Sequence, residues 1–260
     1  MSTRFKPVVG LIRSWDTKTD KWRYPVIIDN MMNLELLEWA AQYSDSTKFA
    51  KIASSHAKLT MKNHFRKDFS SYHVIGYDPE TGEIEKRNTH QGYAHESAWA
   101  RGQAWGLYGY TMMFRETGDS SYLHHAKGIA RFIMSHPNMP KDKVPYWDFN
   151  APNIPHAKRD ASAAAIMASA FIELSTLTKE DPDFSKQCLN MAEMQLRTLT
   201  SAEYLAKKGT NGGFILMHSV GNLPKGTEVD VPLTYADYYY VEALVRYKKM
   251  VLGTLKGKKN

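Results

Sequence analysis

The sequence predicts an all-α fold, built as an array of α/α hairpins with a small β-hairpin inserted. Apolar residues recur at helical spacing through most of the 260 residues, which is the signal of amphipathic helices. The predicted helices come in pairs, separated by irregular segments rich in Pro, Gly and Asn at 136–158 and 207–232. Residues 161–170 are all Ala, Ser, Ile or Met, and a helix without a polar face must be surrounded by others.

The first helix pair is predicted at 30–43 and 47–64. In the first helix, Met32, Leu36, Trp39 and Ala40 fall on one apolar stripe. The second helix carries Ala residues at compatible spacing. The short connection between the two favours an antiparallel pair.

The β-hairpin is predicted next, where 72–77 and 84–87 flank the turn-forming sequence Asp78-Pro79-Glu80-Thr81-Gly82. Helices then resume at 97–117, 120–135, 160–178, 183–206 and 235–252. No segment repeats at a strict period, which argues against a solenoid. We therefore expect one domain over 1–252 and a basic tail at 253–260.

The charge balance does not favour a nucleic-acid partner. The formal net charge is +7, but six basic residues and no acidic residue lie between Arg246 and the C-terminus. That short segment accounts for six of the seven net charges, and the rest of the chain is nearly neutral. A general positive field for a polyanion is therefore not expected over the body of the protein.

The available residue types exclude several kinds of site. A single cysteine, Cys188, allows neither an internal disulfide nor a cysteine zinc site. The chain has no Gly-rich phosphate loop before a helix and no His-Glu-x-x-His, so we expect no cofactor and no metal. The longest apolar run, 163–174, is shorter than the roughly 20 residues of a membrane span. The chain starts without the apolar stretch of a signal peptide, and the compartment and oligomeric state stay open.

Asp29 is the first candidate site residue. It follows Pro25-Val26-Ile27-Ile28 and precedes Met31, so apolar neighbours could raise the pKa of its carboxyl into the range of a general acid. The alternative is that Asp29 only caps the helix that starts at Asn30. Both roles can coexist.

A second candidate cluster lies at 89–105, where two Trp, an Arg and two Gln run from a loop into a helix. Ser97, Arg101 and Trp105 are spaced i, i+4, i+8 and are expected on one helix face. Sugars are bound by aromatic rings and by side chains that address hydroxyls and carboxylates. The alternative is that Trp99 and Trp105 are core residues and Arg101 a structural ion-pair partner.

At these clusters together the chain resembles the unsaturated glucuronyl hydrolases of glycoside hydrolase family 88. The order and separation of the matching segments extend over nearly the whole chain. The motifs are Ile28-Asp29-Asn30-Met31-Met32-Asn33-Leu34, Thr89-His90-Gln91-Gly92, Ser97-x-Trp99-x-Arg101-Gly102-Gln103-Ala104-Trp105, Arg159-Asp160-Ala161-Ser162-Ala163-Ala164-Ala165-Ile166, and Asp230-Val231-Pro232-Leu233 with Tyr235-Ala236-Asp237-Tyr238-Tyr239.

The resemblance implies an (α/α)6 toroid with the active site at one end of the inner helices. It also implies removal of the 4,5-unsaturated uronic acid that polysaccharide lyases leave at the non-reducing end of acidic glycans. In that reaction one aspartic acid protonates C4 of the vinyl ether and then helps water add at C5. Ordinary glycosidases instead act at the anomeric carbon with two carboxylates.

Carried over by motif, Asp29 is the acid and base of this reaction. Arg101 and Gln91 address the substrate carboxylate, and Trp15, Trp99 and Trp105 wall or stack the sugar. His73 either hydrogen-bonds near the double bond or is a structural residue of the hairpin. In the loop 216–225, Ser219 or Lys225 meets a sulfate or is solvated.

Members of this family are longer at the N-terminus, where a second active-site aspartate lies. We therefore expect an incomplete toroid with an exposed apolar flank and weak or absent activity. The alternative function is a catalytically impaired carbohydrate-binding relic of the family. A third idea is an anionic-polymer binder that uses the basic tail. The parent polysaccharide stays open.

Overall fold

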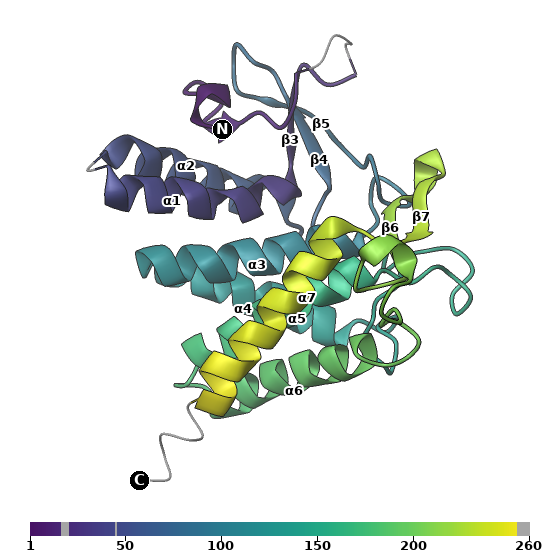
Figure 1. Ribbon diagram of the computed structural model, residues 1–260. Coiled ribbons are helices and arrows are strands. Elements are labelled where there is room, and N and C mark those ends of the chain that lie inside the picture. The colour runs from purple at the N-terminus through teal and green to yellow at the C-terminus, as the bar shows by residue number, and fades with distance from the viewer. Residues whose placement is uncertain (17–20, 45, 254–260) are drawn as a thin grey trace.

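The computed structural model describes residues 1–16, 21–44 and 46–253 (Figure 1). Apart from Gly253, the predicted basic tail lies outside this range. No helix in the described part of the chain is long and apolar enough to cross a membrane. The α-helices are α1 (Leu34–Tyr43), α2 (Thr47–His64), α3 (Ala100–Thr117), α4 (Ser120–Ser135), α5 (Ala161–Leu177), α6 (Pro182–Leu199) and α7 (Thr234–Arg246).

Consecutive helices pair as α1 with α2, α3 with α4, and α5 with α6, and α7 crosses α5 (Figure 1). The predicted α/α hairpin array is therefore confirmed. Helix α5 lies at its centre, in contact with α3, α6 and α7. Its buried residues run without interruption from Ala161 to Ser175, as its lack of a polar face predicts.

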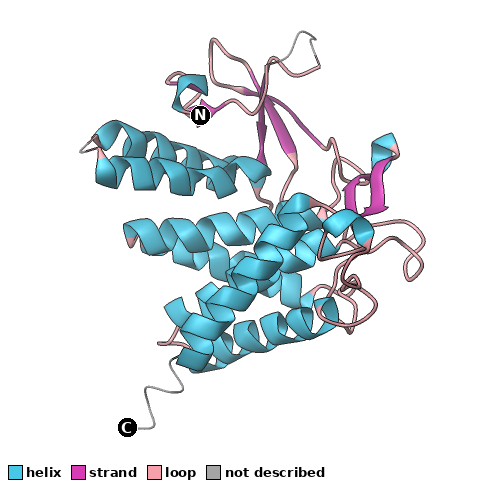
Figure 2. Ribbon diagram, viewed as in Figure 1, coloured by secondary structure: helices cyan, strands magenta, loops and turns pink. Residues whose placement is uncertain are grey.

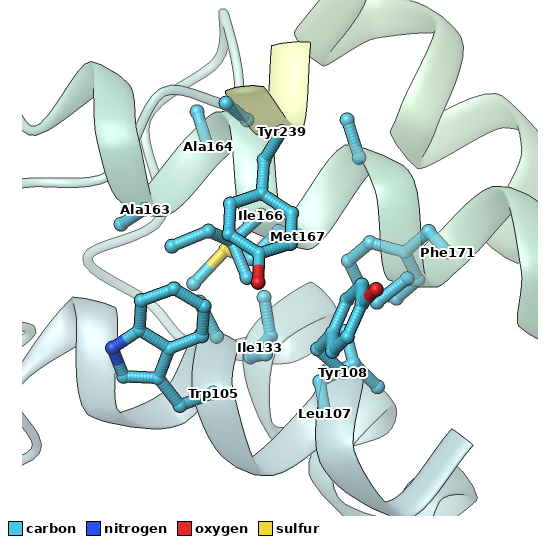
Figure 3. Packing of buried hydrophobic residues seen from close by; sticks show 14 of the residues in the cluster. Trp105, Leu107, Tyr108, Ile133, Ala163, Ala164, Ile166, Met167, Phe171 and Tyr239 are labelled. Carbon is cyan, nitrogen blue, oxygen red and sulfur yellow. The ribbon is translucent and has the colours of Figure 1, made fainter. Parts of the chain in front are cut away.

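The core is built where α3, α5 and α7 meet (Figure 3). Trp105 and Tyr108 of α3 lie against Tyr239 of α7, with ring centroids 5.2 and 5.1 Å away. Ile166 and Met167 of α5 are fully buried beside them. This packing fixes the end of α3 that carries Arg101 and Trp105.

Several predicted helix boundaries are wrong. The first helix is preceded by a six-residue 3-10 segment, η2 (Ile28–Asn33), and α6 ends at Leu199 rather than at 206. Helix α3 begins at Ala100, so Ser97 does not share a helix face with Arg101. The reason is that Ser97 Oγ donates to Asp148 at 2.7 Å, which holds the preceding segment against the 146–150 loop. Helix α7 ends at Arg246 and continues as a π-helical turn, Tyr247–Leu252.

In the described part of the chain, three small antiparallel sheets accompany the helices (Figure 2). The predicted hairpin is confirmed as β4 (Val74–Tyr77) and β5 (Ile84–Asn88), but β3 (Tyr24–Ile27) pairs with β4 and was not predicted. The other sheets are β1 (Phe5–Lys6) with β2 (Leu11–Ile12), and β6 (Ser219–Asn222) with β7 (Thr227–Val231). Strand β3 leads directly into η2 and so places Asp29.

One face of α1 is apolar and open to solvent. Leu36 and Trp39 are 60% and 54% exposed. The expectation that their apolar stripe packs against the core is therefore wrong for these two side chains. Helix α1 instead buries Leu34 and Leu37. Between α1 and α7 lies an open groove of about 690 Å3, lined by Met32, Asn33, Glu35, Leu36, Trp39, Tyr108, Thr234, Tyr235, Tyr238 and Tyr239.

Candidate active site

Asp29 lies in η2, directly after β3. Its neighbours Ile28 and Met31 are fully buried, while its own side chain is 23% exposed. The residue that caps η2 is Ile27, and no side chain forms a cap hydrogen bond there, so the interpretation of Asp29 as a helix cap is wrong. Among the described residues Asp29 Oδ2 has no hydrogen-bond partner. A buried carboxylate oxygen without a partner is available to a ligand.

His73, the residue directly before β4, lies close to this oxygen. The backbone N–H of Ile28 donates to the His73 carbonyl at 3.1 Å, which joins the two segments. His73 Nε2 lies 3.7 Å from Asp29 Oδ2, too far for a hydrogen bond, and it too is buried without a partner among the described residues. The two polar atoms therefore lie close together, and among the described residues neither has a hydrogen-bond partner.

The tautomer of His73 follows from its other nitrogen. The backbone N–H groups of His90 and Gln91 both donate to His73 Nδ1 at 3.1 Å. Because a backbone N–H can only donate, Nδ1 is unprotonated and the proton of the neutral ring is on Nε2. His73 thus presents an N–H toward Asp29, and its other edge holds the 89–91 loop.

The electrostatics of the pair suit acid–base chemistry. Burial raises the pKa of Asp29 to about 6, against the opposing effect of the Arg101 cation and the Trp105 indole N–H. Burial, together with the positive potential of His90 and Arg101, holds the pKa of His73 well below its usual value. His73 therefore stays neutral where Asp29 titrates.

Arg101 and Gln91 converge on strand β6. Arg101 is 2% exposed; its Nη1 donates to Asp160 Oδ2 at 3.0 Å and its Nη2 to the Gly221 carbonyl at 2.8 Å. Gln91 Nε2 donates to the same Gly221 carbonyl at 2.9 Å. The two predicted carboxylate-binding side chains are thus adjacent, and Arg101 also has the ion-pair partner that the alternative interpretation requires.

Of the tryptophans, Trp99 lies closest to the acid–base pair. Its indole stacks on His73 with ring centroids 4.3 Å apart, and the Arg101 guanidinium lies 4.5 Å from the Trp99 ring. Only 2% of Trp99 is exposed. Trp99 therefore contacts His73 and Arg101 at once and holds them in relation to each other.

Trp105 and Trp15 lie on different sides of the site. Trp105 is buried against Tyr239, and its indole N–H has no hydrogen-bond partner among the described residues. Trp15 is partly exposed and packs against Trp22 and His90, with ring centroids 5.8 and 6.1 Å away. Trp105 is near enough to Asp29 to lower the pKa of its carboxyl, whereas Trp15 packs against the 89–91 loop.

The sequence did not identify Asp160 or Tyr235 as site residues. Asp160 caps the α5 helix and also pairs with Arg101. The Tyr235 ring lies 5.3 Å from the Arg101 guanidinium. In the 216–225 loop, Ser219 is fully buried in β6, so the solvated alternative is wrong for Ser219, whereas Lys225 is exposed.

Comparisons with known proteins agree on one family. The chain is 51% identical over 250 residues to an "Unsaturated glucuronyl hydrolase" of Formosa agariphila, covering 96% of this chain and 61% of that protein. It is 36% identical over 249 residues to an "Unsaturated chondroitin disaccharide hydrolase" of Streptococcus pneumoniae, covering 95% of this chain and 61% of that protein. A search of protein-family models found no match.

Among solved structures, the chain superposes on an unsaturated glucuronyl hydrolase specific for heparin with a TM-score of 0.91 and 55% identity. The match covers 96% of this chain and 66% of that one. The predicted α/α toroid class, incomplete in this chain, is thereby confirmed. The chain spans about three fifths of the length of the curated relatives described above.

Proposed function

Because the chain belongs to the unsaturated glucuronyl hydrolase family, we propose that it removes the 4,5-unsaturated uronic acid from the non-reducing end of acidic oligosaccharides produced by polysaccharide lyases. The observation that carries this proposal is the juxtaposition of the Asp29 carboxyl with the N–H of neutral His73, 3.7 Å apart and both without a hydrogen-bond partner among the described residues. The names of the relatives support the same activity.

Asp29 acts first as an acid and then as a base. Protonated Asp29 donates its proton to C4, and the positive charge that develops at C5 is shared with the ring oxygen. Water then adds to C5 and gives a proton to the Asp29 carboxylate, which restores the acid. The hemiketal opens by cleavage of the bond between C5 and the ring oxygen. The anomeric carbon then becomes an aldehyde, and the remaining sugar leaves with the glycosidic oxygen.

The neighbouring side chains bind and orient the substrate. His73 donates its N–H to a substrate oxygen beside the double bond, since Nδ1 is already occupied by backbone donors. Arg101 and Gln91 attract the substrate carboxylate, because a guanidinium and an amide N–H both suit carboxylate oxygens. Trp15 and Trp105 wall the sugar ring, and Trp99 supports His73 from behind.

Titration with unsaturated disaccharides from heparin and from chondroitin tests this function. Binding with loss of the ultraviolet absorbance of the double bond supports the hydrolase. Binding without consumption favours the carbohydrate-binding relic, and absence of both contradicts the proposed substrate class. Deleting residues 246–260 tests the third hypothesis, an anionic-polymer binder that uses the basic tail. If the site around Asp29 binds the disaccharide, binding is expected to survive this deletion.

The pH profile follows from the raised pKa of Asp29. The first step requires the protonated acid, so kcat/KM is expected to fall as the pH rises above about 6. This fall of kcat/KM is the alkaline limb of the pH profile, and an aspartate with its ordinary pKa would place it roughly two pH units lower. Initial rates from about pH 4 to 8 measure the midpoint, and a limb near pH 4 would contradict this role for Asp29.

A further inference from the structure

Asp160 is a fully buried carboxylate that joins three elements next to the site. Oδ1 accepts from the backbone N–H and the hydroxyl of Ser162, at 3.0 and 2.6 Å, in the first turn of α5. It also accepts from the Val220 N–H of β6 at 3.3 Å. Oδ2 accepts from Arg101 Nη1 of α3 at 3.0 Å.

Capping α5 does not require this negative charge. Neutral Ser and Asn cap helices about as well as Asp does. Asp119 and Asp181 cap α4 and α6 in the same way, but their charges are partly exposed and pair with surface lysines, Lys58 and Lys127. Asp160 instead pairs with Arg101 in the interior, where desolvation makes an ion pair a weak source of stability.

The hydrogen bonds of Arg101 indicate the role of the Asp160 carboxylate. Arg101 also donates to the Val220 and Gly221 carbonyls, so its guanidinium is held between Asp160 and β6. We infer that Asp160 is a positioning residue for the proposed reaction, because its carboxylate fixes the Arg101 cation against β6 and partly balances the charge that Asp29 experiences.

The groups that face Asp29 define the expected effect. Among the described residues they are His73 directly before β4, Arg101 and Trp105 on α3, and Tyr235 on α7. His73 and Tyr235 are neutral near pH 6, because burial lowers the pKa of His73 and raises that of Tyr235. Arg101 is thus the permanent charge among these groups. Without Asp160 this cation is less balanced, which favours ionised Asp29 and lowers its pKa.

The test replaces Asp160→Asn and, separately, Asp160→Ser, which retains a helix cap and removes the charge. Both are expected to shift the alkaline limb of kcat/KM to lower pH by about half a unit to one unit. The control is Asp181→Asn, which removes the charge of a capping carboxylate paired with Lys127, far along the chain from Asp29. Asp181→Asn is expected to leave the limb in place.

A second readout does not depend on turnover. The carboxyl carbon of Asp29, assigned by its loss in Asp29→Asn, is titrated by NMR in the wild-type chain and in the Asp160 variants. If the pKa of Asp29 is lower in the Asp160 variants but the wild-type chain is inactive, the positioning role of Asp160 is supported and the proposed function is contradicted. An unshifted Asp29 midpoint, or failure of both Asp160 variants to fold while Asp181→Asn folds, would overturn the inference and leave Asp160 a structural residue.

Discussion

Asp29→Asn is expected to reduce turnover of an unsaturated uronyl disaccharide by about a thousandfold, which is within the range that general acid–base catalysis contributes. Asn has the shape of Asp but cannot donate an acidic proton to C4 or accept one from water. Disaccharide binding is expected to stay within about threefold, because the groups proposed to bind substrate are unchanged. Absorbance assays give the rate, and calorimetry gives the Kd.

The matched control for this variant is Asp16→Asn. Asp16 is an exposed aspartate that pairs with Arg13. Its replacement is expected to leave turnover within about twofold, as surface substitutions usually do. If Asp29→Asn kept a tenth or more of wild-type turnover, Asp29 would not be the acid.

Although Asp29→Asn is expected to abolish most of the turnover, it is expected to raise the stability of the fold near neutral pH. The pKa of Asp29 is about 6 in the folded chain, against an ordinary value of 3.8 for an aspartate in the unfolded chain. Folding therefore favours the protonated form. This contribution is fully present below about pH 4 and is lost as the pH rises to 6. Above that, an ionised Asp29 destabilises the fold by about 1–3 kcal/mol. Asn does not titrate, so the variant is expected to be more stable than wild type at about pH 7, by urea unfolding.

The second large effect is expected from Gly109→Ala in the middle of α3. A Cβ at Gly109 would lie 2.5 Å from Met31 Cβ and 3.1 Å from the Met31 carbonyl carbon. Overpacking of this kind costs about 2 kcal/mol or more, which exceeds the helix propensity that Ala gains. Because Met31 belongs to η2, relief of the clash must displace the segment that carries Asp29. We therefore expect lower stability and a kcat reduced about tenfold or more.

Gly106→Ala is the control for that substitution. It lies on the same helix, but its Cβ would meet only the ends of the Phe65 and Ile129 side chains, at 3.0 and 3.4 Å. These side chains can shift, so urea unfolding is expected to show a change below about 1 kcal/mol, and kcat is expected to stay near wild type. Equal losses in both variants would show that η2 is not held by its contact with Gly109.

The helices were predictable from local pattern, whereas the sheets were only partly so. Apolar periodicity identifies each of the helices α1 to α7, and the Asp78–Gly82 turn identifies the β4–β5 hairpin. Strand β3 was missed because its partner β4 lies about fifty residues further along the chain. The stripe with Leu36 and Trp39 was visible as a pattern, but a pattern does not tell which face packs against a neighbour.

The candidate site, too, could be predicted only in part from the sequence. Apolar neighbours in the sequence predicted the raised pKa of Asp29, and desolvation in the structure has this effect. The contacts of Arg101 could not be predicted, because Val220 and Gly221 lie 119 and 120 residues away. The tautomer of His73 depends on backbone donors of the 89–91 loop, which no local pattern reveals.

We propose that the chain hydrates the double bond instead of cleaving at the anomeric carbon. NMR of the reaction in deuterium oxide tests this most directly, with an unsaturated uronyl disaccharide and the wild-type chain. We predict that the C4=C5 signals disappear as the second sugar is released, with one deuterium appearing at C4 in the first product. A released uronic acid that still carries its double bond would contradict hydration at C4 and C5.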